Sequence, residues 1–136
     1  MSHYMRVKTQ LQEPRFILAA LDAMNLAYEV SSTETGMLLR GWLDNARADI
    51  VVRQATLRAQ GYTAHADLGF RQTEEGYEVL MDDYDLNRYG GREKLVNPLV
   101  QQYGVAFALD WAEEQGFTAE VVPQANGDIQ VVTTQW

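Results

Sequence analysis

The chain has no cysteine and few prolines, histidines or basic residues. Its 136 residues include 3 Pro, 2 His and 11 Lys or Arg against 19 Asp and Glu, which gives a formal net charge of −8. Without cysteine, disulfides, thiolate nucleophiles and zinc–cysteine or iron–sulfur sites are excluded. The acidic balance repels polyphosphate and anionic lipid, and the basic residues form no stripe. We therefore expect neither nucleic acid nor a membrane surface as a partner.

Long apolar runs are also missing. No stretch approaches the twenty apolar residues that span a bilayer, and no basic segment followed by an apolar one marks a secretory signal. Hydrophobic residues nevertheless make up 46% of the chain. A chain of this length and composition can bury one core but not two. We expect a single domain, 1–136, in the cytoplasm.

Two segments have the apolar spacing of α-helices. The first begins at Pro14 and ends near Asn25, and the second runs from Asn97 to about Gln115. Proline is accepted at the first helical position, and Asn97 before a proline is a typical N-terminal cap. The apolar residues along one side of the second segment are Val100, Tyr103, Phe107 and Trp111, with Leu99 and Ala106 beside them. We expect this side to be buried.

β-strand patterns occupy much of the remaining chain. They lie at residues 4–8, 27–30, 37–42, 50–53, 66–71, 77–81, 119–122 and 129–132. Polar or glycine-containing turns predict three hairpins, namely 27–30 with 37–42, 66–71 with 77–81, and 119–122 with 129–132. Residues 54–62 fit either a helical turn or a surface loop. The pattern predicts an α+β domain with two helices packed on one face of an antiparallel sheet.

One short pattern occurs twice. Ala-Leu-Asp at 20–22 is followed by Glu-Val at 29–30, a glycine at 36 and a tryptophan at 42, and the same residues recur at 108–110, 120–121, 127 and 136. The interval from glutamate to glycine is identical in both copies. A helix followed by a hairpin fits each copy, so the pattern is consistent with a duplicated helix–hairpin unit.

An acidic segment follows the predicted strand 77–81. Asp83, Asp85 and Asn87 reproduce the alternating oxygen ligands that open a calcium loop, and Asp82 adds another carboxylate. The rest of the calcium pattern is missing, because Arg88 stands where the loop needs glycine and Lys94 stands in the glutamate position. Asp83, Asp85 and Asn87 are therefore candidate metal ligands in an incomplete site. The alternative is a solvated turn that leaves a strand.

The candidates for acid–base chemistry are His3, His65, Asp67 and Glu78. His65 and Asp67 are expected on the same side of one strand, where they could interact. Two histidines are too few for a metal site made of histidine alone, and no serine is placed for a nucleophilic triad.

Two further features are candidates for binding. Tyr89-Gly90-Gly91-Arg92 combines an aromatic ring, two glycines and a guanidinium, which could form a backbone concavity for an anion or a carboxylate. A flexible connection between elements is the alternative. Trp136 is a bulky apolar residue at the end of the sequence, and it is ordered only if this domain or a neighbour buries it.

Several short motifs, taken in order, resemble a known family. They are Met1-Ser2-His3 leading to Lys8-Thr9, Asp67-Leu68-Gly69-Phe70 with Tyr77-Glu78, Gly116-Phe117, and Gly127-Asp128 before the final Gln135-Trp136. This arrangement resembles a hypothetical chloroplast reading-frame family of algal plastids, cyanobacteria and other bacteria, a domain of unknown function. The resemblance implies a stand-alone cytosolic or stromal domain and provides no catalytic residues.

Together these observations favour a small protein-binding or assembly module without a cofactor. Its partner would be another protein or a second copy of the chain, bound through an exposed sheet edge or the acidic segment. The candidate binding residues are Asp82, Asp83, Asp85, Tyr89, Arg92 and Trp136. The alternative is a small metal-dependent or acid–base enzyme that uses the Asp82–Asp85 cluster with His65 nearby.

Overall fold

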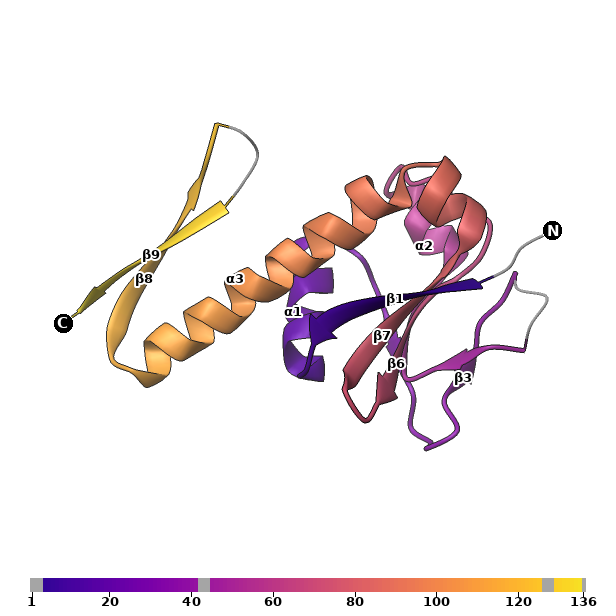
Figure 1. The fold of residues 1–136 in the computed structure, drawn as a ribbon, viewed down its shortest axis with the longest axis horizontal. Helices are drawn as coiled ribbons and strands as arrows, with labels where there is room; N and C mark the ends of the chain where they lie inside the picture. The colour runs from indigo at the N-terminus through magenta and orange to yellow at the C-terminus, as the bar shows by residue number, and fades with distance from the viewer. Residues whose placement is uncertain (1–3, 42–44, 126–128, 136) are drawn as a thin grey trace.

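The centre of the fold is an antiparallel sheet, seen in a computed structural model that describes residues 4–41, 45–125 and 129–135. Its five strands lie in the order β1-β7-β6-β5-β2 (Figure 1). Their bounds are Tyr4–Leu11 for β1, Glu29–Val30 for β2, Ile50–Val52 for β5, Leu68–Thr73 for β6 and Gly76–Asp82 for β7. Strands β6 and β7 form the predicted hairpin, with Phe70 opposite Val79.

Helices cover one face of this sheet, as predicted. They are α1 (Pro14–Ala23), α2 (Gln54–Ala59) and α3 (Asn97–Glu114). The core between the layers includes Phe16, Ile17 and Leu21 of α1, Leu57 of α2, Leu99 and Tyr103 of α3, and Val52, Leu68, Phe70 and Val79 of the sheet. The segment 54–62, which the sequence left open, is therefore helical in its first part because Leu57 contributes to the core.

A short two-stranded ribbon covers part of the other face. It consists of β3 (Met37–Leu38) and β4 (Arg47–Ala48). A second, smaller apolar cluster is made of Leu39, Ala46, Ala48, Val51 and Leu80. The predicted hairpin of 27–30 with 37–42 is wrong, because β2 pairs with β5 while β3 pairs with β4. Trp42 lies outside the described residues.

The C-terminal hairpin forms as predicted but stands apart from the main sheet. Strands β8 (Phe117–Pro123) and β9 (Ile129–Gln135) pair only with each other in the described part of the chain. Figure 1 shows α3 continuing past α1 and carrying this hairpin away from the five-stranded sheet. The strands after α1 thus join two different sheets, whereas those after α3 pair together. The two segments of the proposed duplication therefore differ in strand pairing.

The first half of α3 packs on the core, and the second half extends beyond it. Leu99 and Tyr103 are buried, whereas Val100, Phe107 and Trp111 are exposed. The prediction that these last three residues are buried is wrong. Phe107 and Trp111 are exposed because the helix outruns the layer it covers, whereas Val100 is exposed within the half that packs on the core. The predicted cap at Asn97 is also wrong. Asn97 has helical dihedral angles and continues a preceding π-helical turn, Arg92–Val96.

Membrane insertion was not expected from the sequence. Within residues 4–41, 45–125 and 129–135, none of the helices combines the length and apolar character needed to cross a bilayer.

Candidate functional site

Two π-helical turns connect β7 to α3 and bury the acidic segment. The first, Tyr84–Arg88 (η1), contains Asp85, and Asp82 is the last residue of β7. The interpretation of this segment as a solvated turn is wrong for these two residues, since Asp82 is 0% exposed and Asp85 is 2% exposed. Leu86 and Leu95 anchor the turns in the hydrophobic core. That anchoring rotates the Asp85 carboxylate inward.

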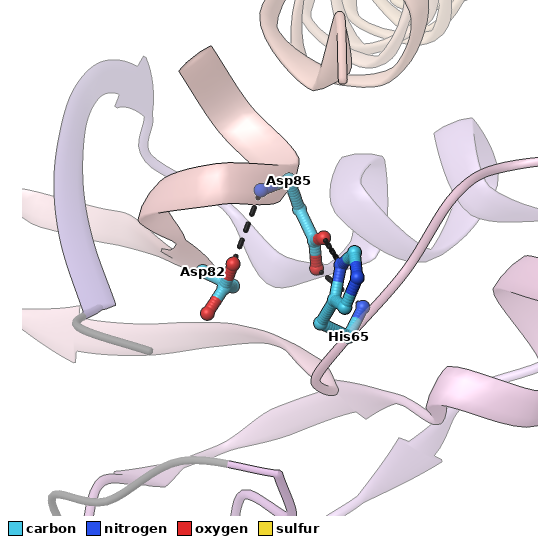
Figure 2. A group of neighbouring side chains, drawn as sticks. All are labelled: His65, Asp82 and Asp85. Carbon is cyan, nitrogen blue, oxygen red and sulfur yellow. Dashed lines mark hydrogen bonds and ion pairs between the residues drawn. The ribbon is translucent and has the colours of Figure 1, made fainter. Parts of the chain in front are cut away.

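His65 lies directly against the Asp85 carboxylate (Figure 2). Its backbone N–H donates to Asp85 Oδ2 at 2.8 Å, and its ring Nδ1 lies 2.6 Å from Asp85 Oδ1. The imidazole stacks on the ring of Tyr89, with 5.1 Å between ring centroids. The His65 side chain is 42% exposed. The histidine is thus held on two sides and open to solvent on another.

Asp82 completes a cluster of three potential ligands. Its Oδ1 accepts from the backbone N–H of Asp85 at 3.1 Å. Its Oδ2 is buried and has no hydrogen-bond partner among the described residues. His65, Asp82 and Asp85 each place one ligand atom within 4.8 Å of the others. We refer to these three residues as the His65–Asp82–Asp85 cluster.

Other residues predicted for the metal or binding site lie elsewhere or outside the described residues. Asp83 accepts a hydrogen bond from the Asn87 side chain at 2.7 Å, so these two bond each other in an exposed position. Arg92 is exposed at the start of the second π-helical turn. His3 and Trp136 fall outside the described residues. The sequence had paired Asp85 with Asp83 and Asn87, whereas the structure brings it to His65.

Asp67, which was expected beside His65, anchors a polar network with Arg40, Arg53 and Gln54. Its carboxylate accepts from the backbone N–H groups of Arg40 and Gln54, both at 2.8 Å, and from the Arg53 guanidinium at 2.7 Å. The hydrogen bond to Glu29 raises the pKa of Arg53, with burial opposing this and Asp67 adding to it. The fourth candidate, Glu78, accepts from Arg71 at 2.6 Å. Both carboxylates therefore have structural partners.

A small cavity lies beside the His65–Asp82–Asp85 cluster. It has a volume of about 40 Å³ and is lined in part by Tyr89, Gly91 and by Ala64 and Met81, the chain neighbours of His65 and Asp82. Because one water needs roughly 10–15 Å³ of such space, the cavity has room for a few waters and is much smaller than a typical ligand pocket.

A second candidate surface runs along α3, from the half that packs on the core to the half that extends beyond it. A shallow groove of about 430 Å³ runs between the end of β1 and α3. It is lined by Leu11, Gln12, Glu13, Val100, Tyr103, Gly104 and Phe107. Trp111, one helical turn further, is 45% exposed and contacts Phe117 of β8. The sequence had assigned this apolar row to the core, so its exposure was missed.

Comparison with known proteins gives a family but no activity. The uncharacterized protein ycf35 of Pyropia yezoensis is 21% identical over 137 residues, an alignment that covers 100% of this chain and 98% of that protein. No solved structure matches the chain. Residues 20–132 match the family described as "Protein of unknown function (DUF1257)". The chain therefore belongs to the DUF1257 family, in agreement with the resemblance seen in the sequence.

Proposed function

We propose that the protein is a non-catalytic assembly module that docks another protein on its distal arm, by which we mean residues 100–125 and 129–135. The observation that carries the proposal is the exposed apolar row on α3. Val100 is 38% exposed, Phe107 51% and Trp111 45%. Large aromatic side chains that remain exposed along one helix are typical of protein-binding surfaces.

The groove beside this row supports insertion of a side chain from the partner. Tyr103 and Leu11 are buried and form apolar parts of its lining, while Val100 and Phe107 stand exposed along it. The space beside Gly104 is open, since a Cβ there would meet no atom within 4 Å. An apolar anchor from a partner would remove Phe107 from water, which favours association.

The charge of the arm indicates the chemistry of the partner. Between residues 97 and 136 there are five acidic residues and no Lys, Arg or His. Asp110 forms an ion pair with Arg15 of α1, whereas Glu113, Glu114 and Glu120 are exposed. A partner with apolar anchors surrounded by basic residues complements this surface. A second copy of the chain would place like charges against one another.

The test uses a double variant of the arm and a matched double variant elsewhere. Phe107→Ser with Trp111→Ser removes the two exposed aromatics of α3. Val30→Ser with Leu38→Ser removes two residues of comparable exposure, 56% and 43%, on the short strands β2 and β3. A protein captured from native lysate by the unmodified chain is purified, and its affinity for each variant is measured at two salt concentrations.

We expect the arm variant to bind about tenfold or more weakly and the control to bind normally, because aromatic hot spots contribute more than 1 kcal/mol each. Added salt should weaken binding, since the complementary charges are exposed. Equal affinities for the two variants would reject the arm as the docking site. Sedimentation of the chain as a dimer that the arm variant dissociates would reject a different protein as the partner.

A further inference from the structure

We propose that His65, Asp82 and Asp85 bind one divalent transition-metal ion, for which Zn²⁺ is the best-suited candidate. The cluster combines one imidazole with two carboxylates, and one ligand atom of each residue lies within 4.8 Å of the others. The site lies between β7 and the first π-helical turn, among elements different from the distal arm. It is therefore independent of the proposed docking function.

The strongest indication is the unpaired oxygen of Asp82. Asp82 is fully buried, and its Oδ2 has no hydrogen-bond partner in the described part of the chain. An ionised carboxylate removed from water is costly unless a cation or hydrogen-bond donors compensate it. A metal ion held jointly with Asp85 and His65 supplies that compensation.

Hydrogen bonds hold both carboxylates close to the imidazole (Figure 2). Asp82 is fixed through Oδ1 by the backbone N–H of Asp85, which leaves Oδ2 available. Asp85 is fixed through Oδ2 by the backbone N–H of His65, which leaves Oδ1 facing the imidazole. Such outer contacts are what set the direction of metal ligands in proteins.

The dimensions suit a small cation after a limited adjustment. Zinc lies about 2.0–2.2 Å from nitrogen and oxygen ligands, which keeps ligand atoms roughly 3–4 Å apart. The Nδ1–Oδ1 pair, at 2.6 Å, must open slightly, and any separation that approaches the 4.8 Å limit must close. A metal ion bound at His65 Nδ1 takes the place of the direct contact between Nδ1 and Asp85 Oδ1, and the neutral imidazole then carries its proton on Nε2.

The donor set favours a transition metal over calcium or magnesium. Ca²⁺ and Mg²⁺ bind oxygen ligands almost exclusively, whereas imidazole suits Zn²⁺ and its neighbours in the first row. Among metals that accept one nitrogen and two oxygens, Zn²⁺ binds more tightly than Mn²⁺ or Fe²⁺. The exposed edge of His65 gives the ion access, and a water molecule can complete its coordination.

The experiment measures metal binding by untagged, chelator-treated protein. Zinc chloride is titrated calorimetrically, metal content is determined after gel filtration, and thermal unfolding is followed with and without the ion. We expect one Zn²⁺ per chain and a higher melting temperature, because a ligand that binds only the folded state stabilises it. Asp82→Asn and His65→Gln should each weaken zinc binding by about 100-fold or more.

Two controls separate loss of a ligand from general damage. Asp83→Asn alters the adjacent exposed carboxylate, and His3→Gln removes the other histidine of the sequence; both should bind zinc as the unmodified chain does. In chelator, Asp82→Asn should unfold as cooperatively as the unmodified protein, because it keeps the shape of the side chain and the Oδ1 acceptor for the backbone N–H of Asp85.

Three outcomes would overturn the proposal. They are no zinc binding by the unmodified chain, zinc binding unaffected by both Asp82→Asn and His65→Gln, or an equal rise in melting temperature with Ca²⁺ or Mg²⁺ as the added ion.

Discussion

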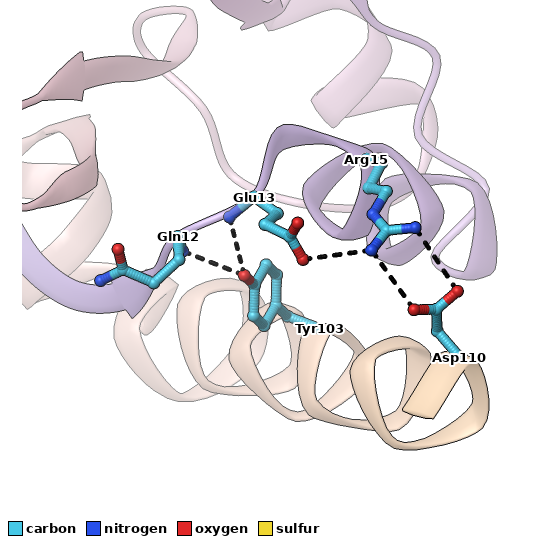
Figure 3. A network of polar contacts seen from close by, with 5 residues as sticks. All are labelled: Gln12, Glu13, Arg15, Tyr103 and Asp110. Carbon is cyan, nitrogen blue, oxygen red and sulfur yellow. Dashed lines mark hydrogen bonds and ion pairs between the residues drawn. The ribbon is translucent and has the colours of Figure 1, made fainter. Parts of the chain in front are cut away.

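The phenol oxygen of Tyr103 lies 2.9 Å from the backbone nitrogen of Glu13 and equally close to that of Gln12 (Figure 3). Glu13 is the residue before the first turn of α1 and makes no side-chain cap. A tyrosine about ninety residues away therefore accepts from two backbone amides at the start of this helix. Arg15 and Asp110 add an ion pair between the same two helices.

Removal of this hydroxyl should destabilise the protein. In Tyr103→Phe the ring still fills the core, but the N–H groups of Gln12 and Glu13 lose their acceptor. We expect the free energy of unfolding to fall by about 1–3 kcal/mol, the cost of leaving partly buried donors unsatisfied. Urea unfolding followed by circular dichroism measures this change.

Tyr28→Phe provides the matched comparison. Tyr28 packs half-buried against the same core, and its hydroxyl makes no hydrogen bond within residues 4–41, 45–125 and 129–135. Its loss should change stability by less than about 0.5 kcal/mol. Equal effects of the two substitutions would show that the Tyr103 hydroxyl contributes nothing specific.

The sequence predicted the local elements well and their long-range pairing less well. Pro14 marked the start of α1, and Asn25, which has a φ of 58°, marked its end. These signals act within a few residues. The partners of β2 and β3 depend instead on contacts between segments distant in the sequence, and no turn signal encodes those pairings.

The residues of the candidate site were likewise predicted one by one, whereas their long-range contact was not. His65 and the acidic segment were each singled out, but their contact joins residues twenty positions apart and depends on the turn at 84–88. Apolar Leu86, Leu95 and Val96 were the available signal that this segment enters the core. A π-helical turn has its own periodicity, so an analysis that assumes strands and α-helices does not place Asp85 inward.

Gly91 should be the glycine least tolerant of a side chain in this region. It is buried, and a Cβ there would lie 2.4 Å from both the Asp85 carbonyl oxygen and the Met81 Cε. Gly91→Ala must therefore push the two π-helical turns apart, and we expect a loss of about 1–3 kcal/mol in thermal or urea unfolding.

Gly104→Ala, in α3, should have the opposite effect on stability. A Cβ at Gly104 meets nothing within 4 Å, and this glycine lies inside α3. Alanine should stabilise the helix by about 0.5–1 kcal/mol, because it restricts the unfolded chain more than glycine does. Destabilisation by Gly104→Ala, or no effect of Gly91→Ala, would contradict this assignment of close packing.

The Asp67 network should depend on its charge. Asp67→Asn keeps the size of the side chain but weakens its bonds to Arg53 and to the backbone of Arg40 and Gln54. We expect a loss of about 1–3 kcal/mol in urea unfolding, since these partners are partly buried. Glu29→Gln, on the exposed side of Arg53, should change stability by less than about 1 kcal/mol. A larger effect at Glu29 than at Asp67 would contradict this ranking.

Tyr77 should make the protein less stable in alkaline solution. Burial raises the pKa of this phenol above its ordinary value of 10.0, and the nearby Asp49 charge adds to the effect. The native state therefore keeps the phenol proton at a pH where the unfolded state has lost it. The stabilising contribution is complete below pH 10 and disappears as the pH rises through the native pKa. Through this group the free energy of unfolding falls by at most about 1.4 kcal/mol per pH unit.

Tyr77→Phe removes this titration while keeping the ring in the core. The difference in unfolding free energy between the unmodified protein and Tyr77→Phe should stay constant between about pH 8 and 10. Above that range the difference should shift in favour of the variant, because only the unmodified chain loses stability through this phenol. Urea unfolding at closely spaced pH values provides the comparison. Parallel stability curves for the two proteins up to about pH 11 would show that the Tyr77 phenol titrates alike in both states.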